Sequence, residues 1–293
     1  MFIDNPTVPI QLETVLDLIY ELRHKVATSE TVKVILQPKG LPDLKAKSDQ
    51  AAHQLHAAKE LELVTQDEGG NFRLAYAVRD GKPTAKEAIV RAVDLHVLAS
   101  AEVEPWFGRL YGYVIAREGV IPGEGNGRIN LCTDFNNALP DGVERGNQLN
   151  DTKLPHYVRW YAYAGMGWRD PAKRLVLDPT ERLRRALPSV FNSDQRLEAA
   201  AFMTSLAQVC PELDGGALFN QVCAERYNPA DRVCTAALAM ALRNLHDDGC
   251  IQLDCPQDSQ GWSLERGGSV RNNETLQSDR FDRVTLRLSK KRT

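Results

Sequence analysis

Residues 55–75 read LHAAKELELVTQDEGGNFRLA, and the spacing of apolar side chains changes part-way along this stretch. Apolar residues first recur at helical intervals, as far as Glu62. Leu63 and Val64 follow at once and begin a strand pattern, QDEGGN makes a turn, and FRL returns as a second strand. The stretch therefore predicts a helix that runs directly into a two-stranded hairpin.

A second stretch repeats this order towards the other end of the sequence. Residues 242–266 read LRNLHDDGCIQLDCPQDSQGWSLER, with a helical pattern that ends at Gly249. Glycine there suits the left-handed residue that ends many helices, whereas the first stretch has Glu62. Four positions align: Leu55 with Leu242, Ala58 with Leu245, Leu63 with Cys250 and Val64 with Ile251. The irregular spacing indicates related modules and not a solenoid.

Further helical patterns precede each copy. Helices are expected at residues 11–24, 29–36 and 48–61 before the first hairpin, and at 193–209, 215–226 and 229–248 before the second. Pro229 suits the first turn of the last of these helices. The order of three helices and a hairpin resembles the winged helix-turn-helix layout, over residues 10–78 and 193–266.

The middle of the chain contains a fainter third instance. Residues 154–180, LPHYVRWYAYAGMGWRDPAKRLVLDPT, combine a striped helix ending at Gly165 with a short hairpin. They indicate either another winged unit or a helical spacer with one hairpin. We therefore expect an α+β, mostly helical fold with two to three winged-helix modules in tandem. The expected segments are 1–82, 83–192, and 193–293 with a basic C-terminal strand.

Composition narrows the class of protein. The chain has 293 residues, 43% of them hydrophobic, with a formal net charge of -3, so a basic face must be local. It has no apolar run of about 18 residues and no secretory signal pattern at its start. The six cysteines include no CxxC pair, which favours reduced, buried thiols. We expect a cytoplasmic protein without membrane contact.

Three motifs that could carry chemistry are weak. PGEGNGR at residues 122–128 lacks the spacing and the Lys-Ser of a phosphate loop, so it predicts a mobile loop. His53 and His56 share a helix face without an evident third metal ligand, and contact with DNA or a partner stays open for them. PDGVER at residues 140–145 lacks the downstream lysine of a nuclease. We expect no catalytic residues, metal or cofactor.

Aromatic residues cluster in the third, fainter unit: Tyr157, Trp160, Tyr161, Tyr163 and Trp168. Such a cluster indicates a core or a seam between domains. The alternative is a binding hot spot for a partner, because Trp and Tyr are favoured anchors.

Basic residues are unevenly placed. The last 28 residues have a surplus of five positive charges, and Arg or Lys contacts with phosphate gain affinity by releasing counterions. On the last strand, Val284, Leu286 and Leu288 claim the buried face, which leaves Arg283 and Arg287 exposed. Around the third helix of the first copy stand further lysines, where this layout meets DNA. The predicted DNA-binding residues are Lys39, Lys45, Lys47, Lys59, Arg266, Arg271, Arg283, Arg287, Lys290 and Lys291.

The wing of the first copy is acidic, and it favours a different partner. Glu60, Glu62, Asp67 and Glu68 stand in or near it, and phosphate repels carboxylates. The first module is therefore also a candidate for binding protein.

The entry segment NPTVPI at residues 5–10, the length and the flanking winged units together resemble an accessory protein of bacterial clusters that install deazapurines in DNA. The resemblance implies a non-catalytic component of a DNA modification and antiviral defence system. Its implied partners are double-stranded DNA and other protein subunits of that system. The alternative is a winged-helix protein–protein adaptor without direct DNA contact.

Overall fold

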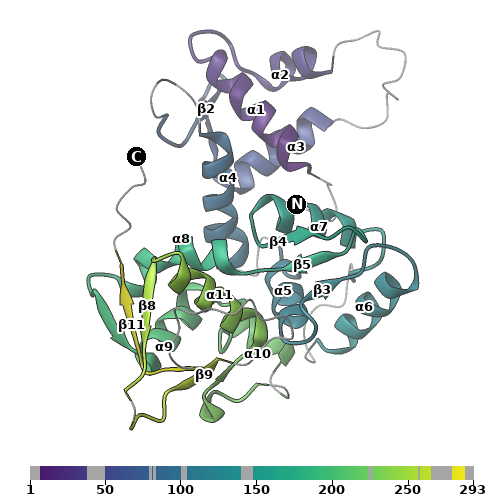
Figure 1. Ribbon diagram of the computed structural model, residues 1–293. Coiled ribbons are helices and arrows are strands. Elements are labelled where there is room, and N and C mark those ends of the chain that lie inside the picture. The colour runs from purple at the N-terminus through teal and green to yellow at the C-terminus, as the bar shows by residue number, and fades with distance from the viewer. Residues whose placement is uncertain are drawn as a thin grey trace. The chain divides into compact units, whose positions relative to one another are not determined.

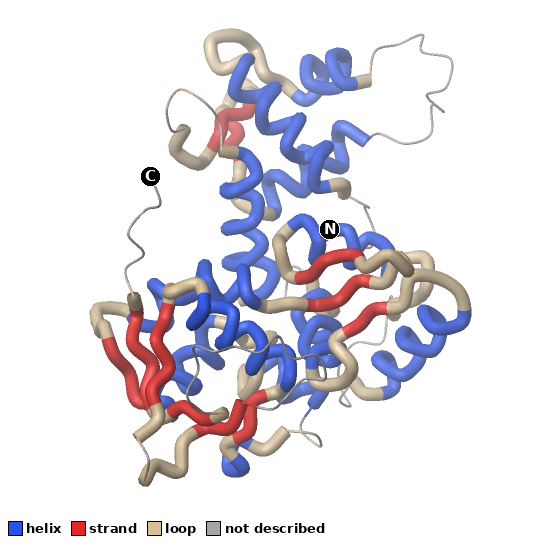
Figure 2. Tube along the Cα trace, viewed as in Figure 1, coloured by secondary structure: helices blue, strands red, loops and turns tan. Residues whose placement is uncertain are grey.

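Helices dominate the chain and short strands form small sheets, which confirms an α+β, mostly helical fold (Figure 1, Figure 2). The computed structural model describes residues 7–37, 50–78, 81, 84–99, 104–139, 148–223, 225, 227–256, 258–264 and 279–287. These group into unit 1, Met1–Glu104 with Pro155–Tyr163, and unit 2, Pro105–Leu154 with Ala164–Thr293. The units divide the chain differently from the three expected segments, whose separate folding stays a prediction.

Unit 1 begins with three helices and a hairpin, in the order that the sequence predicts. The elements are α1 (Pro9–Glu21), α2 (Ser29–Leu36), α3 (Gln50–Glu60), β1 (Val64–Gln66) and β2 (Phe72–Leu74). Thr28 caps α2, because its hydroxyl oxygen accepts the N–H of Thr31 at 3.3 Å. Helix α4 (Ala85–Ala92) follows and continues into the π-helical segment η1 (Val93–Leu98).

Helix α7 (Leu154–Tyr163) completes the core of unit 1 from far along the sequence. Trp160 is fully buried, and its indole N–H donates to the carbonyl oxygen of Thr7 at 3.1 Å. Tyr157 is also fully buried and donates to a carboxylate oxygen of Glu104 at 2.5 Å. The core of unit 1 therefore depends on contacts between distant parts of the chain.

The two aligned helix-to-strand junctions share one backbone geometry. Gly249 has φ 68° and Glu62 has φ 53°, both in the left-handed region. The next residue then donates its N–H to the carbonyl five positions back, at 2.8 Å for Leu63 and 2.9 Å for Cys250. This is the Schellman arrangement that ends a helix. Strand β1 begins just beyond the first junction and β8 (Ile251–Asp254) just beyond the second.

The part of unit 2 that the structure describes contains six further α-helices and three small sheets. Its helices are α5 (Phe107–Ile115), α6 (Asn126–Asn137), α8 (Thr180–Phe191), α9 (Ala199–Val209), α10 (Ala217–Cys223) and α11 (Ala236–Asp247). The first sheet has the order β3 (Val120–Ile121), β5 (Leu175–Leu177), β4 (Gly167–Arg169). The second is β6 (Arg196–Glu198), β11 (Arg283–Leu286), β8, and the third is β10 (Arg280–Phe281), β9 (Trp262–Leu264), β7 (Val233–Cys234).

Two helix starts in unit 2 differ from the sequence expectation. The helix expected from residue 193 begins at Ala199, because residues 196–198 pair with β11 as strand β6. The helix expected from Pro229 begins at Ala236, and Pro229 instead opens a separate 3-10 turn. Thr235 caps α11 and is itself held by the carboxylate of Asp214, at 2.7 Å from both its N–H and its hydroxyl. Both differences arise from long-range contacts.

A buried ion pair ties α8 to the segment between α9 and α10. The guanidinium Nε of Arg182 donates to Glu212 Oε1 at 2.9 Å, and the side chains are 3% and 0% exposed. A second guanidinium nitrogen of Arg182 donates to the carbonyl oxygen of Val209 at 3.0 Å. A buried charge that loses its partner keeps its full desolvation cost, so the pair is sensitive to single changes.

The two junctions give opposite expectations for mutation. Glu62→Gly should raise the free energy of unfolding by up to about 1 kcal/mol, since glycine adopts positive φ without steric cost. Gly249→Ala should lower it by about 1 kcal/mol for the same reason. Glu60→Gly, the same change two residues earlier in helical backbone, is the control and should destabilise. Urea denaturation measures all three, and equal effects of Glu62→Gly and Glu60→Gly would contradict the assignment.

The buried pair gives a second expectation. Arg182→Met should lower the free energy of unfolding by about 3–5 kcal/mol, because Glu212 keeps a buried charge without its guanidinium. The double variant Arg182→Met with Glu212→Leu should recover most of that loss, because no buried charge remains. Thermal and urea unfolding of the three proteins check this. A double variant no more stable than Arg182→Met would show that the pair is not the cause.

Candidate nucleic-acid interface

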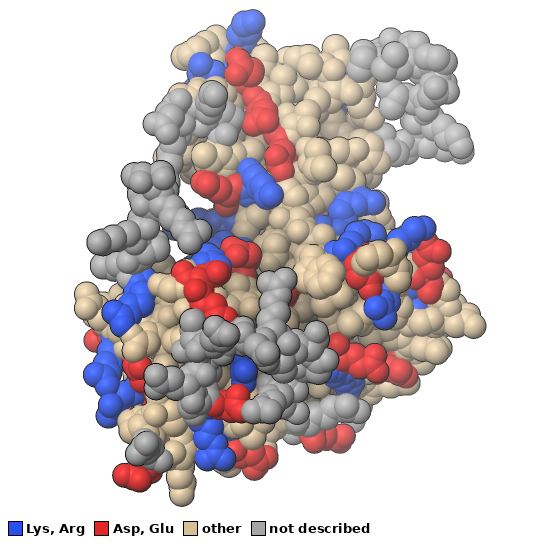
Figure 3. Space-filling view, viewed as in Figure 1, with Lys and Arg blue, Asp and Glu red and all other residues tan. Residues whose placement is uncertain are grey.

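The outer face of the β6–β11–β8 sheet carries Arg283 and Arg287 of the predicted C-terminal basic segment, whereas Arg280 lies on β10. Arg283 and Thr285 alternate with Val284, which is fully buried, so the pleat turns the arginine outwards as predicted. Arg287 follows the strand and is exposed. Figure 3 shows Lys and Arg side chains gathered over the region that Figure 1 labels β8 and β11. The face is therefore available to an anion.

Carboxylates on the neighbouring strands compensate part of this positive charge. Arg283 lies opposite Glu198 on one side and Asp254 on the other. Its Nε is 3.1 Å from Glu198 Oε1, and the side chains are 37% and 62% exposed. Arg287 donates to the side-chain oxygen of Gln252. An exposed ion pair contributes little to stability, so phosphate could replace Glu198 as the partner of Arg283.

Seven of the ten predicted DNA-binding residues lie outside the described part of the chain: Lys39, Lys45, Lys47, Arg266, Arg271, Lys290 and Lys291. Their role stays a prediction. The structure thus brings Arg283 and Arg287 together on one sheet, while Lys59 lies in unit 1.

Helix α3 presents a small polar face. Lys59 is exposed, donates to Gln66 Oε1 at 2.5 Å and lies 5.1 Å from the centre of the Phe72 ring. His56 is 3.3 Å from Glu60. These contacts fold the lysine towards the wing and place a carboxylate beside the histidine, so the face is not strongly basic.

The β1–β2 hairpin, which is the predicted wing of unit 1, keeps its negative charge. Asp67 accepts the backbone N–H of Asn71 at 2.8 Å. This hydrogen bond, with a smaller contribution from Arg73, holds the pKa of the Asp67 carboxyl below its usual range. The wing is therefore poorly suited to phosphate, as the sequence predicts.

The third helix of the second copy is enclosed by its own unit. Along α11, Leu238, Leu242 and Leu245 are fully buried, and Met240 is exposed by only 39%. Helix α8 packs along it. The apolar side of α11 is therefore used for packing within unit 2, whereas Met240 and Asp247 on its other side are exposed. The second copy keeps the predicted order of elements.

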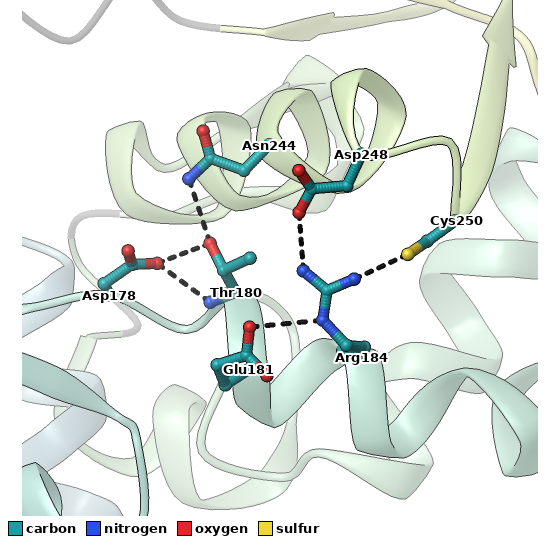
Figure 4. A network of polar contacts seen from close by, with 7 residues as sticks. All are labelled: Asp178, Thr180, Glu181, Arg184, Asn244, Asp248 and Cys250. Carbon is teal, nitrogen blue, oxygen red and sulfur yellow. Dashed lines mark hydrogen bonds and ion pairs between the residues drawn. The ribbon is translucent and has the colours of Figure 1, made fainter. Parts of the chain in front are cut away.

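A polar network joins α8 to α11 in unit 2 (Figure 4). The Arg184 guanidinium contacts three groups, Glu181 at 3.1 Å, Asp248 at 2.6 Å and the Cys250 sulfur at 2.6 Å. Nearby, Asp178 accepts the N–H and the hydroxyl of Thr180, and Asn244 donates to the same hydroxyl at 3.1 Å. The network fixes two helix ends, and each of its groups already has a structural partner.

Asp214 is a buried carboxyl beneath the start of α11. It is 1% exposed, and burial raises its pKa to about 6 although two hydrogen bonds from Thr235 oppose the rise. Burial also raises the pKa of the nearby Tyr227 hydroxyl and Cys234 thiol. Neither of these groups therefore titrates near neutral pH, and Asp214 is the group that responds there.

The predicted aromatic cluster is divided between core and surface. Tyr157, Trp160 and Tyr161 are fully buried, which confirms a core role for them, whereas Trp168 on β4 is 52% exposed. The sequence analysis did not select the cations Arg169, Lys173 and Arg174, which belong to the segment RDPAKR that follows Trp168. The signal available in the sequence was the alternation of Val176 with Leu175 and Leu177 on β5, the strand that pairs with Trp168.

Comparison with known families identifies one segment. Residues 130–259 match the family model described as DpdG-like. This domain is similar to an accessory protein of the Dpd deazapurine DNA modification system, in agreement with the expected resemblance. The DpdG-like segment covers somewhat less than half of the chain and includes the Arg184 network, but not residues 5–10, which were one of the three features behind the resemblance. No curated protein and no solved structure matches the chain.

Two features are absent among the residues that the structure describes. No helix among them is long and apolar enough to cross a membrane. They also include no group of three or more His, Cys, Asp and Glu side chains that could hold a metal ion.

The raised pKa of Asp214 predicts the pH dependence of stability. The folded state holds the proton more tightly than the unfolded chain, whose usual pKa is 3.8. The contribution of Asp214 to the free energy of unfolding should therefore fall by about 3 kcal/mol as pH rises from about 4 to about 6, and stay constant above. Urea denaturation of the native protein and Asp214→Asn across that range measures the difference. Parallel curves for the two proteins would refute the prediction.

Proposed function

We propose that the chain is a non-catalytic, DNA-binding component of the Dpd DNA modification and defence system. The DpdG-like match carries the proposal, because it relates the chain to an accessory protein of that system. The outer face of the β6–β11–β8 sheet supplies a means of binding, since Arg283 and Arg287 stand there with solvent access. Contact with phosphate positions a protein on duplex DNA without reading its sequence.

A titration of labelled duplex DNA at two salt concentrations tests this proposal. Replacing both Arg283 and Arg287 by Ala should weaken binding about equally for unrelated sequences. It should also remove up to about two units from the slope of log affinity against log salt. The matched control, Arg91→Ala with Arg159→Ala, removes two exposed cations from α4 and α7 and should leave binding unchanged.

Glu198 offers a change in the opposite direction. Glu198→Gln removes the carboxylate that competes with phosphate for Arg283, so duplex affinity should rise by about two- to five-fold. A native protein that fails to bind duplex DNA even at about 50 mM salt, where phosphate contacts are strongest, would overturn the proposal.

An adaptor role is the second candidate, and one observation favours it. Unit 1 exposes four apolar side chains on and around α1 and α2, namely Ile10 (70%), Val26 (59%), Val34 (48%) and Ile35 (48%). Such residues are suited to contact with another protein. Absence of duplex binding together with stable assembly with other Dpd proteins would select this role.

A further inference from the structure

The β4–β5 hairpin of unit 2 exposes the one accessible tryptophan of the chain. Of the four tryptophans, Trp106, Trp160 and Trp262 are 4%, 0% and 7% exposed, whereas Trp168 is 52% exposed. A buried indole contributes a large apolar area to a core. An indole in solvent forgoes that gain, which points to a role in contact with something else.

The pleat of the sheet holds Trp168 on the outer face. Its cross-strand partner is Val176, which in turn pairs with Val120, so the three side chains form one row across β4, β5 and β3. Both valines are half-buried, while the alternate residues Leu175 and Leu177 are buried. A turn of the indole into the core would require a one-residue slip that also exposes the leucines.

Three exposed cations belong to the same hairpin as the indole, and Arg169 follows Trp168 at the end of β4, opposite Leu175. Arg169, Lys173 and Arg174 are all exposed, and Figure 3 shows Lys and Arg side chains, with Asp and Glu among them, over the region of β4 and β5. Asp170 binds Arg174 at 2.7 Å, and Glu124 lies 3.2 Å from Lys173 in a pair that is more than 70% exposed on both sides. Arg169 has no ion pair or side-chain hydrogen bond with the described part of the chain. The hairpin therefore keeps a positive surplus beside its aromatic side chain.

The turn that carries these cations is well ordered. The Asp170 carboxylate accepts the backbone N–H of Arg174 at 2.9 Å, and Lys173 donates its N–H to the Asp170 carbonyl at 2.9 Å. The loop before α6 packs against it, since a Cβ at Gly123 would lie 3.0 Å from the carbonyl oxygens of Ala172 and Lys173. These contacts hold the backbone of the turn, and a preformed turn lowers the entropic cost of binding.

We propose that this hairpin binds single-stranded nucleic acid, with an unpaired base stacked on Trp168 and phosphates contacted by Arg169 and Lys173. An aromatic platform flanked by cations is the general means of binding single strands. In duplex DNA the faces of the bases are already stacked on their neighbours, so the platform selects unpaired bases. The inference rests on the proposed DNA function and deepens it, but it concerns a different surface from the β6–β11–β8 sheet.

Intrinsic fluorescence tests the stacking directly, because three of the four tryptophans are buried. Adding a 12-nucleotide oligodeoxythymidine to the full chain should quench the emission of Trp168 in a saturable way. In Trp168→Phe the quench should disappear while an end-labelled oligomer still binds, since phenylalanine also stacks. Trp168→Ala should lower affinity by about ten-fold. Met240→Ala, which truncates an exposed apolar side chain on α11, should change neither signal.

Charge and sugar are tested with the same oligomers. Arg169→Gln should weaken binding and reduce its salt dependence by just under one unit of slope. Oligouridine of the same length distinguishes the source of the strand: equal binding supports stacking on either nucleic acid, and preferential binding of oligodeoxythymidine supports a DNA strand.

Two results would overturn the inference. One is binding of the oligomer by Trp168→Ala within two-fold of the native protein, with no quench in the native protein. The other is that Trp168→Ala binds the oligomer with unchanged affinity but no longer assembles with other Dpd proteins, which would assign Trp168 to a protein interface. If the native protein does not bind duplex DNA but the oligomer still quenches Trp168, only the proposed duplex contact is wrong. The two failures are therefore distinguishable.

Discussion

A single left-handed residue turns each of the two repeated helices directly into a strand. At Glu62 and at Gly249 the helix ends with the same pair of backbone hydrogen bonds. In both copies the strand begins two residues later. Because side chains alternate between the faces of a strand, the position of this residue decides which side chains enter the core. In the second copy it places Ile251 and Leu253 on the buried face of β8. Strand β11 then pairs with the edge of β8.

The third helix of the two copies lies in different surroundings. Helix α3 keeps a polar face in solvent, with Lys59 and His56 on it, whereas α11 packs its apolar side against α8 and the neighbouring strands. The Arg184 network belongs to this cover, because it links α8 to the end of α11. A repeated sequence pattern thus indicates a shared architecture, and the residues packed around it decide which surface remains for a partner.

Local patterns allowed much of the fold to be predicted, and long-range contacts account for the rest. The order of elements, the stop at Gly249 and the inward Val284 follow from spacing along one segment. The start of α11 does not, because Thr235 becomes its cap only when Asp214, 21 positions earlier, holds it. The exposure of Trp168 depends on its pairing with Val176. For the candidate site, the outward arginines were predictable, but the carboxylate beside Arg283 comes from a strand 85 positions away.

The insertion of α7 into unit 1 also has a consequence for synthesis of the protein. The Thr7 carbonyl can accept the hydrogen bond from the Trp160 indole only after 153 further residues have been made. Until then the N-terminal helices leave the ribosome without the helix that closes their core. A chain ending near residue 104 would keep the elements of the first module but lack that closure. The N-terminal unit is therefore first in the sequence but is completed only once residue 163 has been made, and until then its apolar surface is open to chaperones and proteases.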